Sequence, residues 1–417
     1  MEKYVVMGGR PLSGKVTIGG SKNSVLTLLP ACLLTDEKCV LYDAPDLSDV
    51  NHMLSVLEVL GADTDKKQRT ITVDAARLQF QTIPDRLARS LRASNLILGP
   101  LLARLGQAWI PYPGGCSIGS RPMDQHLRGL RLMGAEITEK FGCIEARAKR
   151  LRGCEICLDF PSVGATENLM MAATLAQGVT TIQNAAREPE IVELQNFLNA
   201  MGARVKGGGS NSLRIEGVDR LRGAEHVLIP DRIEAGTYMV MALATKGQIY
   251  LENVIPEHLE AVIAKLREAG AVIREEEGGL WIGSPEKLKP VDCKTMPYPG
   301  FPTDMQAQLM ALMTTVPGAS IATETIFENR FQHVAELCRM GADIRLDGRT
   351  AVVQGVPALS GAYVEATDLR AGAALVTAAM MAEGASVVGN IHYIDRGYEH
   401  FEQKLSNLGA QIMRITS

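Results

Sequence analysis

The stretch AELCRMGADIRLDGRTAVVQG, residues 335–355, contains the pattern that organises the whole chain. Its first residues are typical of an amphipathic helix that ends at Gly341, and two short strands follow, joined by the turn Asp347-Gly348. The same order of helix, Gly-Ala and strand recurs about every 70 residues. Six copies of one unit therefore account for the chain, and their glycines are Gly61, Gly134, Gly202, Gly270, Gly341 and Gly409.

A second helix is expected in each copy, and it is apolar on nearly every side. Residues 169–175 and 373–381 contain almost no polar side chain. A helix without a polar face has to be buried all round, so it forms the centre of a domain. The sequence thus predicts an α/β protein with two domains, each made of three βαβαββ-like units around buried helices. These helices are expected to begin near Ser21, Arg92, Gly164, Gly236, Asp304 and Arg370.

The last copy is incomplete, because the chain ends at Ser417, soon after Gly409. Residues 4–6 and 16–18 have the character of the missing strands, so residues 1–21 are expected to complete the sixth copy. This predicts one discontinuous domain, residues 1–21 plus 230–417, and a second domain, residues 22–229. A chain that crosses twice between domains is typical of proteins that close over a ligand.

Composition restricts the class of protein. The 417 residues are 46% hydrophobic and 22% charged, with a net charge of −4, which suits a soluble globular protein and not a nonspecific nucleic-acid binder. No apolar run is long enough to span a membrane, and we see no signal peptide. The eight cysteines are too sparse for a disulfide framework. We therefore expect a cytoplasmic protein that needs no nucleic acid, membrane or obligate protein partner.

Three of the buried helices are expected to start with a cation: Lys22, Arg92 and Arg370. A helix N-terminus already carries partial positive charge, so a cation there is unfavourable unless an anion binds nearby. A solvated surface cation is the alternative for each position taken alone. The repetition at three equivalent positions favours an anionic ligand.

The segment Pro113-Gly114-Gly115-Cys116 reads as an exposed loop, because residues 111–122 are rich in Pro and Gly. A cysteine on such a loop, followed by Arg121, is a candidate acid or nucleophile, because a nearby cation lowers a thiol pKa. The alternative is a thiol without a function in a turn.

Asp304 comes directly before a buried helix, as either an ordinary N-cap or a general base that faces a cleft. Arg330 and Arg396 each have an acidic neighbour in sequence, so each forms a local ion pair or binds a ligand. The histidines show no metal-ligand spacing, so we expect no metal and no other cofactor.

At this level of detail the chain resembles the enolpyruvyl transferases over its whole length, and among them the enzymes that act on UDP-N-acetylglucosamine. The resemblance implies their inside-out α/β fold, with two domains of three repeats each. The rival 5-enolpyruvylshikimate-3-phosphate synthases lack the Pro-Gly-Gly-Cys loop and the Arg-Pro-Met-Asp segment. The segments that carry the resemblance are 20–23, 91–94, 113–116, 121–124, 162–166, 184–191, 230–237, 301–306, 327–330, 366–370 and 394–398.

The resemblance implies a site for phosphoenolpyruvate between the domains. Asp304 would take the proton of the sugar 3′-hydroxyl, and Cys116 would protonate the methylene carbon of phosphoenolpyruvate and could form a covalent adduct with it. Asp368 would assist in the same pocket. The charges of phosphoenolpyruvate would be met by Lys22, Arg121, Arg370 and Arg396, with Arg92 nearby.

The resemblance also implies contacts to the nucleotide sugar. Asn23, Arg92 and the Ile326 backbone would position the sugar, beside Phe327 and Arg330. The uridine end would lie along Arg121, Pro122, Met123, Asp124 and Gln125 and along Ser162, Val163 and Gly164.

The implied activity is enolpyruvyl transfer in peptidoglycan synthesis, hence in cell-wall biogenesis, cell shape and division, with fosfomycin as an inhibitor. Two departures from relatives concern substrate contacts: Phe160 and Ser48 stand where many relatives carry a basic residue nearby. A catalytically silent paralogue that senses the nucleotide sugar is the alternative. Such a copy is expected to have lost Cys116, Asp304 or an arginine, and this chain has them all.

Overall fold

The computed structural model describes residues 2–112, 118–119 and 122–416. The chain divides into two compact units, each with its own hydrophobic core. The first unit contains Met1–Gly19, Ser117–Ser120 and Pro230–Ser417, and the second contains Gly20–Cys116 and Arg121–Ile229. The predicted boundary lay two residues later and kept all of 22–229 together. Ile118 and Gly119 depart from that prediction: they belong to the first unit, where the Asn329 N–H donates to the Ile118 carbonyl at 2.9 Å.

The fifth copy shows the repeated unit most clearly. Its opening strand runs parallel to the next strand, and a hairpin then adds two antiparallel strands, in the sheet order β17-β18-β20-β19. The core helix follows the opening strand, and the surface helix precedes the hairpin. The elements are β17 (Cys293–Lys294), η4 (Thr303–Met305), α10 (Gln306–Met313), β18 (Ala319–Thr323), η5 (Arg330–Gln332), α11 (His333–Arg339), β19 (Asp343–Asp347) and β20 (Thr350–Gln354).

The other two copies of the first unit have the same order. The fourth contains β2 (Ser13–Thr17), α8 (Arg232–Ala244), β14 (Gln248–Glu252), η3 (Pro256–Leu259), α9 (Glu260–Glu268), β15 (Val272–Glu276) and β16 (Gly279–Gly283). The sixth contains β21 (Tyr363–Glu365), α12 (Leu369–Met381), β22 (Ala385–Gly389), η6 (Ile391–Arg396), α13 (Phe401–Asn407), β23 (Gln411–Thr416) and β1 (Glu2–Met7).

The prediction that residues 1–21 complete the sixth copy is therefore only half right. β1 pairs with β22 and β23 of the sixth copy, whereas β2 runs parallel to β14 and opens the fourth. The chain leaves one sheet for the next at Gly8 and Gly9, where Gly9 has a φ of +86° that suits glycine.

The second unit contains the first three copies. The first has β13 (Glu225–Val227), α1 (Lys22–Ala31), η1 (Cys32–Leu34), β3 (Cys39–Tyr42), α2 (Ser48–Val59), β4 (Asp63–Lys67) and β5 (Thr70–Asp74). The second has α3 (Asp85–Ser90), η2 (Arg92–Ile97), α4 (Leu98–Leu105), β6 (Gln107–Pro111), α5 (Asp124–Leu132), β7 (Glu136–Lys140) and β8 (Cys143–Arg147). The third has β9 (Glu155–Cys157), α6 (Val163–Ala173), β10 (Val179–Gln183), α7 (Pro189–Ala200), β11 (Arg204–Lys206) and β12 (Ser212–Glu216).

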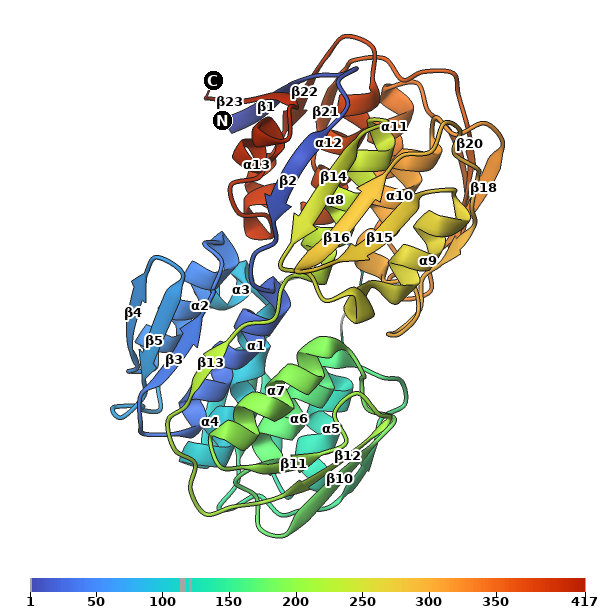
Figure 1. The fold of residues 1–417 in the computed structure, drawn as a ribbon. Coiled ribbons are helices and arrows are strands. Elements are labelled where there is room, and N and C mark those ends of the chain that lie inside the picture. Colours follow the sequence, from blue (N-terminus) through green and yellow to red (C-terminus); the bar gives the residue numbers. More distant parts are fainter. Residues whose placement is uncertain (1, 113–117, 120–121, 417) are drawn as a thin grey trace. The chain divides into compact units, whose positions relative to one another are not determined.

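The core helices are buried as their composition predicts. In α10 every residue is buried, and α8, α10 and α12 pack against one another at the centre of the first unit (Figure 1). In the second unit α4 packs on α6, and α1 contacts the adjoining helices η2 and α7. Asp304, just before α10, accepts a hydrogen bond from Arg370, near the start of α12, so polar side chains of the first unit meet at the starts of its core helices.

The repeated glycines have the predicted conformation. Gly341 follows α11 with a φ of +93°, and the five equivalent glycines have φ between +92° and +102°. A left-handed residue after a helix is cheap only for glycine, so the Gly-Ala pattern marks real helix ends. In the described part of the chain, no helix is both long and apolar enough to cross a bilayer.

Candidate functional site

Asp304 lies between two buried arginines of the first unit. Its Oδ1 accepts a hydrogen bond from Arg330 Nη2 at 3.0 Å, and its Oδ2 accepts from Arg370 Nε at 3.2 Å. The arginine side chains are 3% and 2% exposed, whereas that of Asp304 is 28% exposed. Asp304 is the middle residue of η4 and caps no helix there, so the N-cap interpretation is wrong. Asp304 is therefore a partly exposed carboxylate that is paired with two buried arginines.

Arg370 is held rigidly from two sides. Its guanidinium lies over the Tyr398 ring at 5.4 Å, and the Tyr398 hydroxyl is 3.0 Å from that of Thr237 in α8. A buried guanidinium group is costly unless it is paired, and Asp304 Oδ2, 3.1 Å from Arg370 Nη2, supplies the opposite charge.

Arg330 does not form the local ion pair that its acidic neighbour in sequence suggested. It pairs with Asp304 across 26 residues, and its guanidinium stacks on the Phe327 ring at 5.7 Å. His333 lies directly beneath, with Nδ1 3.2 Å from the Arg330 carbonyl oxygen. Burial lowers the pKa of His333 to about 4, although the charge of Asp368 opposes this. The imidazole is therefore neutral at physiological pH.

Two more predicted residues lie beside these arginines. Asp368 is the N-cap of α12, and its Oδ1 accepts from the Arg370 and Ala371 N–H groups at 2.8 and 3.1 Å. Arg396 ends η6, which packs on α12. Its neighbour Asp395 accepts two hydrogen bonds from Arg414 of β23, at 2.5 and 3.2 Å. The first unit thus places Asp304, Arg330, Asp368, Arg370 and Arg396 on adjoining elements.

The second unit holds Lys22 at the start of α1. Lys22 is 6% exposed, and its Nζ lies 2.8 Å from Asp49 Oδ2 of α2, which is 2% exposed. The next residue, Asn23, has an exposed side chain. Sequence reasoning missed Asp49, because nothing in the spacing of α2 shows that it faces Lys22.

The predicted uridine segments are also in the second unit. Pro122, Met123 and Asp124 line a cavity of about 730 Å³ beside α5, which is within the range of small-molecule sites. Ser162 caps α6 by accepting from the Ala165 N–H, and Val163 and Gly164 form the first turn. Gln125 departs from the prediction of a ligand contact: it is buried, and its Oε1 accepts from the Asp159 N–H at 2.8 Å.

Three predicted residues cannot be compared with the structure. Cys116 and Arg121 lie outside the described residues. Arg92 begins η2, but its side chain is also outside the described part. Ile326 and Phe327 are described, and both N–H groups donate to Glu324 Oε1.

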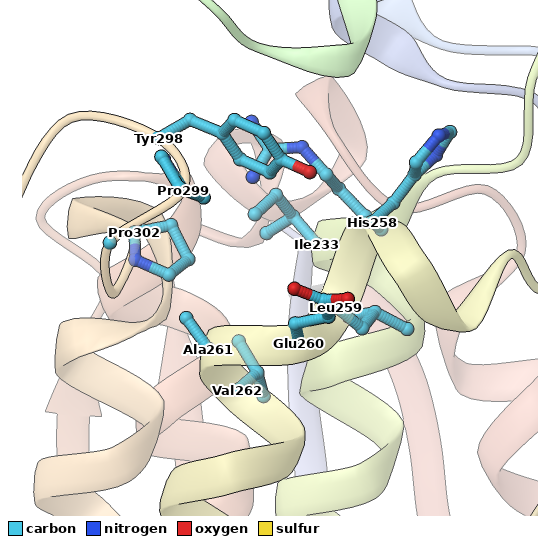
Figure 2. Close-up of a pocket in the computed structure, with 11 residues that line it drawn as sticks. Ile233, His258, Leu259, Glu260, Ala261, Val262, Tyr298, Pro299 and Pro302 are labelled. Atoms are coloured by element: carbon cyan, nitrogen blue, oxygen red, sulfur yellow. The ribbon is translucent and has the colours of Figure 1, made fainter.

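The pocket in Figure 2 is too small for a substrate. It lies where Ile233 of α8 meets Leu259, Glu260 and the Tyr298-Pro299 segment, and its volume is about 10 Å³. That volume holds about one water molecule. The ring of Tyr298 covers Arg232 at 5.6 Å.

Glu167 is a buried carboxyl of the second unit that the sequence did not single out. It is 4% exposed, and its Oε1 lies 2.9 Å from Thr27 Oγ1 of α1. Burial raises the pKa of Glu167 to about 8, the Thr27 bond opposes this, and the charge of Glu190 adds to it. Glu167 is therefore largely protonated at neutral pH.

Glu167→Gln is expected to remove a pH dependence of stability. Because the folded pKa is about 8 and the ordinary value is 4.5, the folded state holds this proton more tightly. Stability therefore falls as pH rises from 4.5 to 8, by about 1.4 kcal/mol per pH unit at most, and the decrease ends above 8. Gln has no proton to lose, so the free energy of unfolding of the variant, relative to that of wild type, should rise by about 2 kcal/mol between pH 6 and pH 8.

Urea unfolding at both pH values measures this, with Trp109 as the fluorescent reporter of the second unit. Glu155→Gln is the matched control, because Glu155 is an exposed carboxylate of β9. If the free energy of unfolding of Glu167→Gln differs from that of wild type by the same amount at pH 6 and pH 8, the raised pKa of Glu167 is contradicted.

The comparisons with known proteins agree over the whole chain. The family described as EPSP synthase (3-phosphoshikimate 1-carboxyvinyltransferase) matches residues 6–405. UDP-N-acetylglucosamine 1-carboxyvinyltransferase 1 of Carboxydothermus hydrogenoformans is 59% identical over 417 residues, 100% of this chain and 99% of that relative. UDP-N-acetylglucosamine 1-carboxyvinyltransferase 2 of the same organism is 55% identical over 418 residues, 100% of both chains.

Among solved structures, the enolpyruvyl transferase NikO from Streptomyces tendae matches with a TM-score of 0.88 and 25% identity, over 100% of this chain and 99% of that one. The inside-out α/β fold expected from the resemblance is thus the fold of this family. The chain belongs to the enolpyruvyl transferases and, within them, to the UDP-N-acetylglucosamine 1-carboxyvinyltransferases.

Proposed function

We propose that this protein transfers the enolpyruvyl group of phosphoenolpyruvate to the 3′-hydroxyl of UDP-N-acetylglucosamine and releases phosphate, as a step of peptidoglycan synthesis. The names of its relatives support these two substrates. Both are soluble metabolites, so the protein works in the cytoplasm and needs no membrane, nucleic acid or protein partner for the reaction.

The observation that carries the proposal is the Arg330–Asp304–Arg370 arrangement. An accessible carboxylate can take the proton of a hydroxyl group. Once Asp304 is neutral, the two guanidinium groups no longer face a carboxylate, so their charge can stabilise the negative charge of phosphoenolpyruvate. One cluster thus supplies both a base and an anion site.

The reaction is an addition followed by an elimination. The 3′-oxygen attacks C2 of phosphoenolpyruvate while C3 gains a proton, so the double bond is lost and a tetrahedral adduct forms. C3 then loses a proton as the C2–O bond to phosphate breaks, and the double bond returns. The chemistry needs one base, one acid and several cations that hold the phosphate and carboxylate groups.

We assign the acid to Cys116 and the base to Asp304, with Asp368 assisting. Residues of both units serve the same reaction. Lys22, Arg92, Arg121, Arg370 and Arg396 hold phosphoenolpyruvate, and Asn23, Ile326, Phe327 and Arg330 position the sugar. Pro122, Met123, Asp124, Ser162, Val163 and Gly164 hold the uridine end. Gln125 acts indirectly, through its hydrogen bond to Asp159.

Phosphate release tests the function. Purified protein is mixed with phosphoenolpyruvate and UDP-N-acetylglucosamine, together and separately, with and without a chelator. Phosphate that appears only with both substrates supports the proposal. Phosphate release with shikimate 3-phosphate in place of the nucleotide sugar would overturn the substrate assignment. If no acceptor supports phosphate release, the protein is not an active transferase.

Fosfomycin is expected to inactivate the protein through Cys116. The thiolate sulfur attacks an epoxide carbon, the carbon–oxygen bond opens, and the oxygen takes a proton, so the protein gains the mass of one inhibitor. Cys116→Asp keeps an acid but has no thiol, so it should keep activity and resist the inhibitor. If Cys116→Asp is inhibited as strongly as wild type, the assignment is wrong. Cys157→Ser is the control, because Cys157 is an exposed cysteine of the described residues.

A further inference from the structure

Glu324 is a buried carboxylate that receives four hydrogen bonds. It follows β18 and is 1% exposed. Its Oε1 accepts from Thr295 Oγ1 at 2.9 Å and from the Ile326 and Phe327 N–H groups at 2.7 and 3.1 Å. Its Oε2 accepts from Thr303 Oγ1 at 2.9 Å.

All four donors are neutral, and within the described part of the chain no Lys, Arg or His pairs with Glu324. A buried carboxylate is costly, so hydrogen bonds must satisfy it. An apolar side chain would fill a purely structural position at lower cost. The presence of a carboxylate here therefore suggests that its four donors have to be held in place.

Two of the connections of Glu324 lead to Asp304 by separate routes. Thr303 is the residue before Asp304 and begins η4. Phe327 provides the ring on which the Arg330 guanidinium stacks at 5.7 Å, and that guanidinium donates to Asp304 Oδ1 at 3.0 Å. The carboxylate thus fixes both the backbone that carries the base and the cation that faces it.

A third connection leads to the backbone assigned to the sugar. Because the Ile326 N–H points to Glu324, the turn 324–327 has a fixed orientation, and with it the Ile326 carbonyl. The fourth donor, Thr295, follows the opening strand β17, and its hydroxyl bonds to Glu324 and to no side chain next to Asp304 among the hydrogen bonds of the described residues. Thr295 Oγ1 also accepts from the Thr325 N–H at 2.9 Å.

We propose that Glu324 is a positioning residue that sets the geometry of the Asp304 base relative to Arg330 and the sugar-binding turn. The proposal rests on the proposed function, because it assigns Asp304 to the 3′-hydroxyl. Misplacing a catalytic group by about 1 Å costs as much as a hundredfold in rate, so the loss of this acceptor should appear mainly in kcat.

Two conservative variants separate positioning from stability. Thr303→Val removes one hydrogen bond, the one beside Asp304. Thr295→Val removes two, the bonds to Glu324 and from Thr325, but none beside Asp304. If Glu324 has a purely structural role, Thr295→Val should lower both stability and kcat more than Thr303→Val does, because it removes more hydrogen bonds. If Glu324 positions Asp304, Thr295→Val should still lose more stability, but Thr303→Val should lose more kcat.

We expect Thr303→Val to lower kcat about tenfold with KM for phosphoenolpyruvate within about twofold, and Thr295→Val to lower kcat less than about twofold. Glu324→Ala should lower kcat about a hundredfold. Glu324→Gln should recover most of it, because its amide oxygen accepts three of the donors and the Thr303 hydroxyl turns to accept from the amide nitrogen.

Steady-state kinetics and thermal unfolding of the full-length variants provide the test. The proposal holds if Thr303→Val loses kcat but less stability than Thr295→Val. It is overturned if kcat of the two variants follows their stability, or if Glu324→Gln is no better than Glu324→Ala. Failure of the proposed function is distinct, because wild type itself would then release no phosphate.

Discussion

Asp304→Asn is expected to lower kcat about a thousandfold, the loss usual for removing a general base. The amide keeps the size of the side chain and one acceptor oxygen, but it takes no proton. Phosphoenolpyruvate should still bind, because the buried arginines that face position 304 remain. Single-turnover phosphate release and equilibrium binding of phosphoenolpyruvate measure the two effects separately.

The same variant should lose stability in the absence of anions. Arg330 and Arg370 are 3% and 2% exposed, and Asp304 neutralises both. Leaving buried cations without a carboxylate costs about 3 kcal/mol. Added phosphate should therefore raise the melting temperature of Asp304→Asn more than that of wild type, because the anion supplies the negative charge that the amide lacks.

Asp292→Asn is a suitable control, because the Asp292 carboxylate is in the same unit and, within the described residues, accepts a hydrogen bond only from the Ile321 N–H. If kcat of Asp304→Asn is within tenfold of the wild-type value, Asp304 is not the general base. A phosphate response equal to that of wild type would show that the arginines do not bind anions.

The repeat architecture was predictable because its signal is local and recurs six times. Gly61, Gly341 and the equivalent glycines mark helix ends, since a φ near +93° excludes most other residues. The all-apolar composition of α10 and α12 indicates helices buried on every side. Each copy strengthens the interpretation of the others, so one ambiguous segment does not change the fold.

The strand exchanges were not predictable from the same signals. β2 joins β14 and β13 joins β3, although 235 and 183 residues separate Thr17 from Glu252 and Tyr42 from Glu225. Strand character is visible in short segments, but the partner depends on long-range packing. Ile118 likewise belongs to the first unit through a backbone hydrogen bond to Asn329, a residue far away in the sequence.

The sequence drew attention to residues that are unusual for their place. Lys22 and Arg370 at helix starts predicted a bound anion, with a solvated surface cation as the alternative. The structure shows both side chains buried and paired with carboxylates of the chain, Asp49 and Asp304, so the solvated alternative is wrong and the bound anion stays a prediction. Asp49 and Glu324 themselves were missed, because an acidic residue near a helix start or after a strand is ordinary. Their roles arise only when separate elements meet.

Gly217→Ala is expected to destabilise the second unit by about 3 kcal/mol, at the upper end of overpacking effects. Gly217 follows β12, and a methyl group there would overlap the carbonyl oxygen of Ala176. Gly355 of the first unit has the equivalent contact with Val316, and Gly8 with Ala382. Backbone lies on both sides of each contact, so no side chain can move aside.

The two tryptophans allow each unit to be followed alone, because Trp109 is in β6 of the second unit and Trp281 in β16 of the first. In urea unfolding, Gly217→Ala should shift the Trp109 transition of a Trp281→Phe background. Gly355→Ala should shift the Trp281 transition of a Trp109→Phe background. Each variant should leave the other reporter nearly unchanged, because the cores are separate.

Gly202→Ala is the matched control for the steric argument. Gly202 has a φ of +100° and open space around its Cα, so alanine there is opposed by backbone conformation alone, about 1 kcal/mol. Gly217 lacks a positive φ, so its cost is the overlap alone. If Gly217→Ala costs no more than Gly202→Ala, the close approach of hairpin and helix end does not constrain the fold. If it costs about three times as much, the repeat is defined by that contact as well as by the helix-ending glycine.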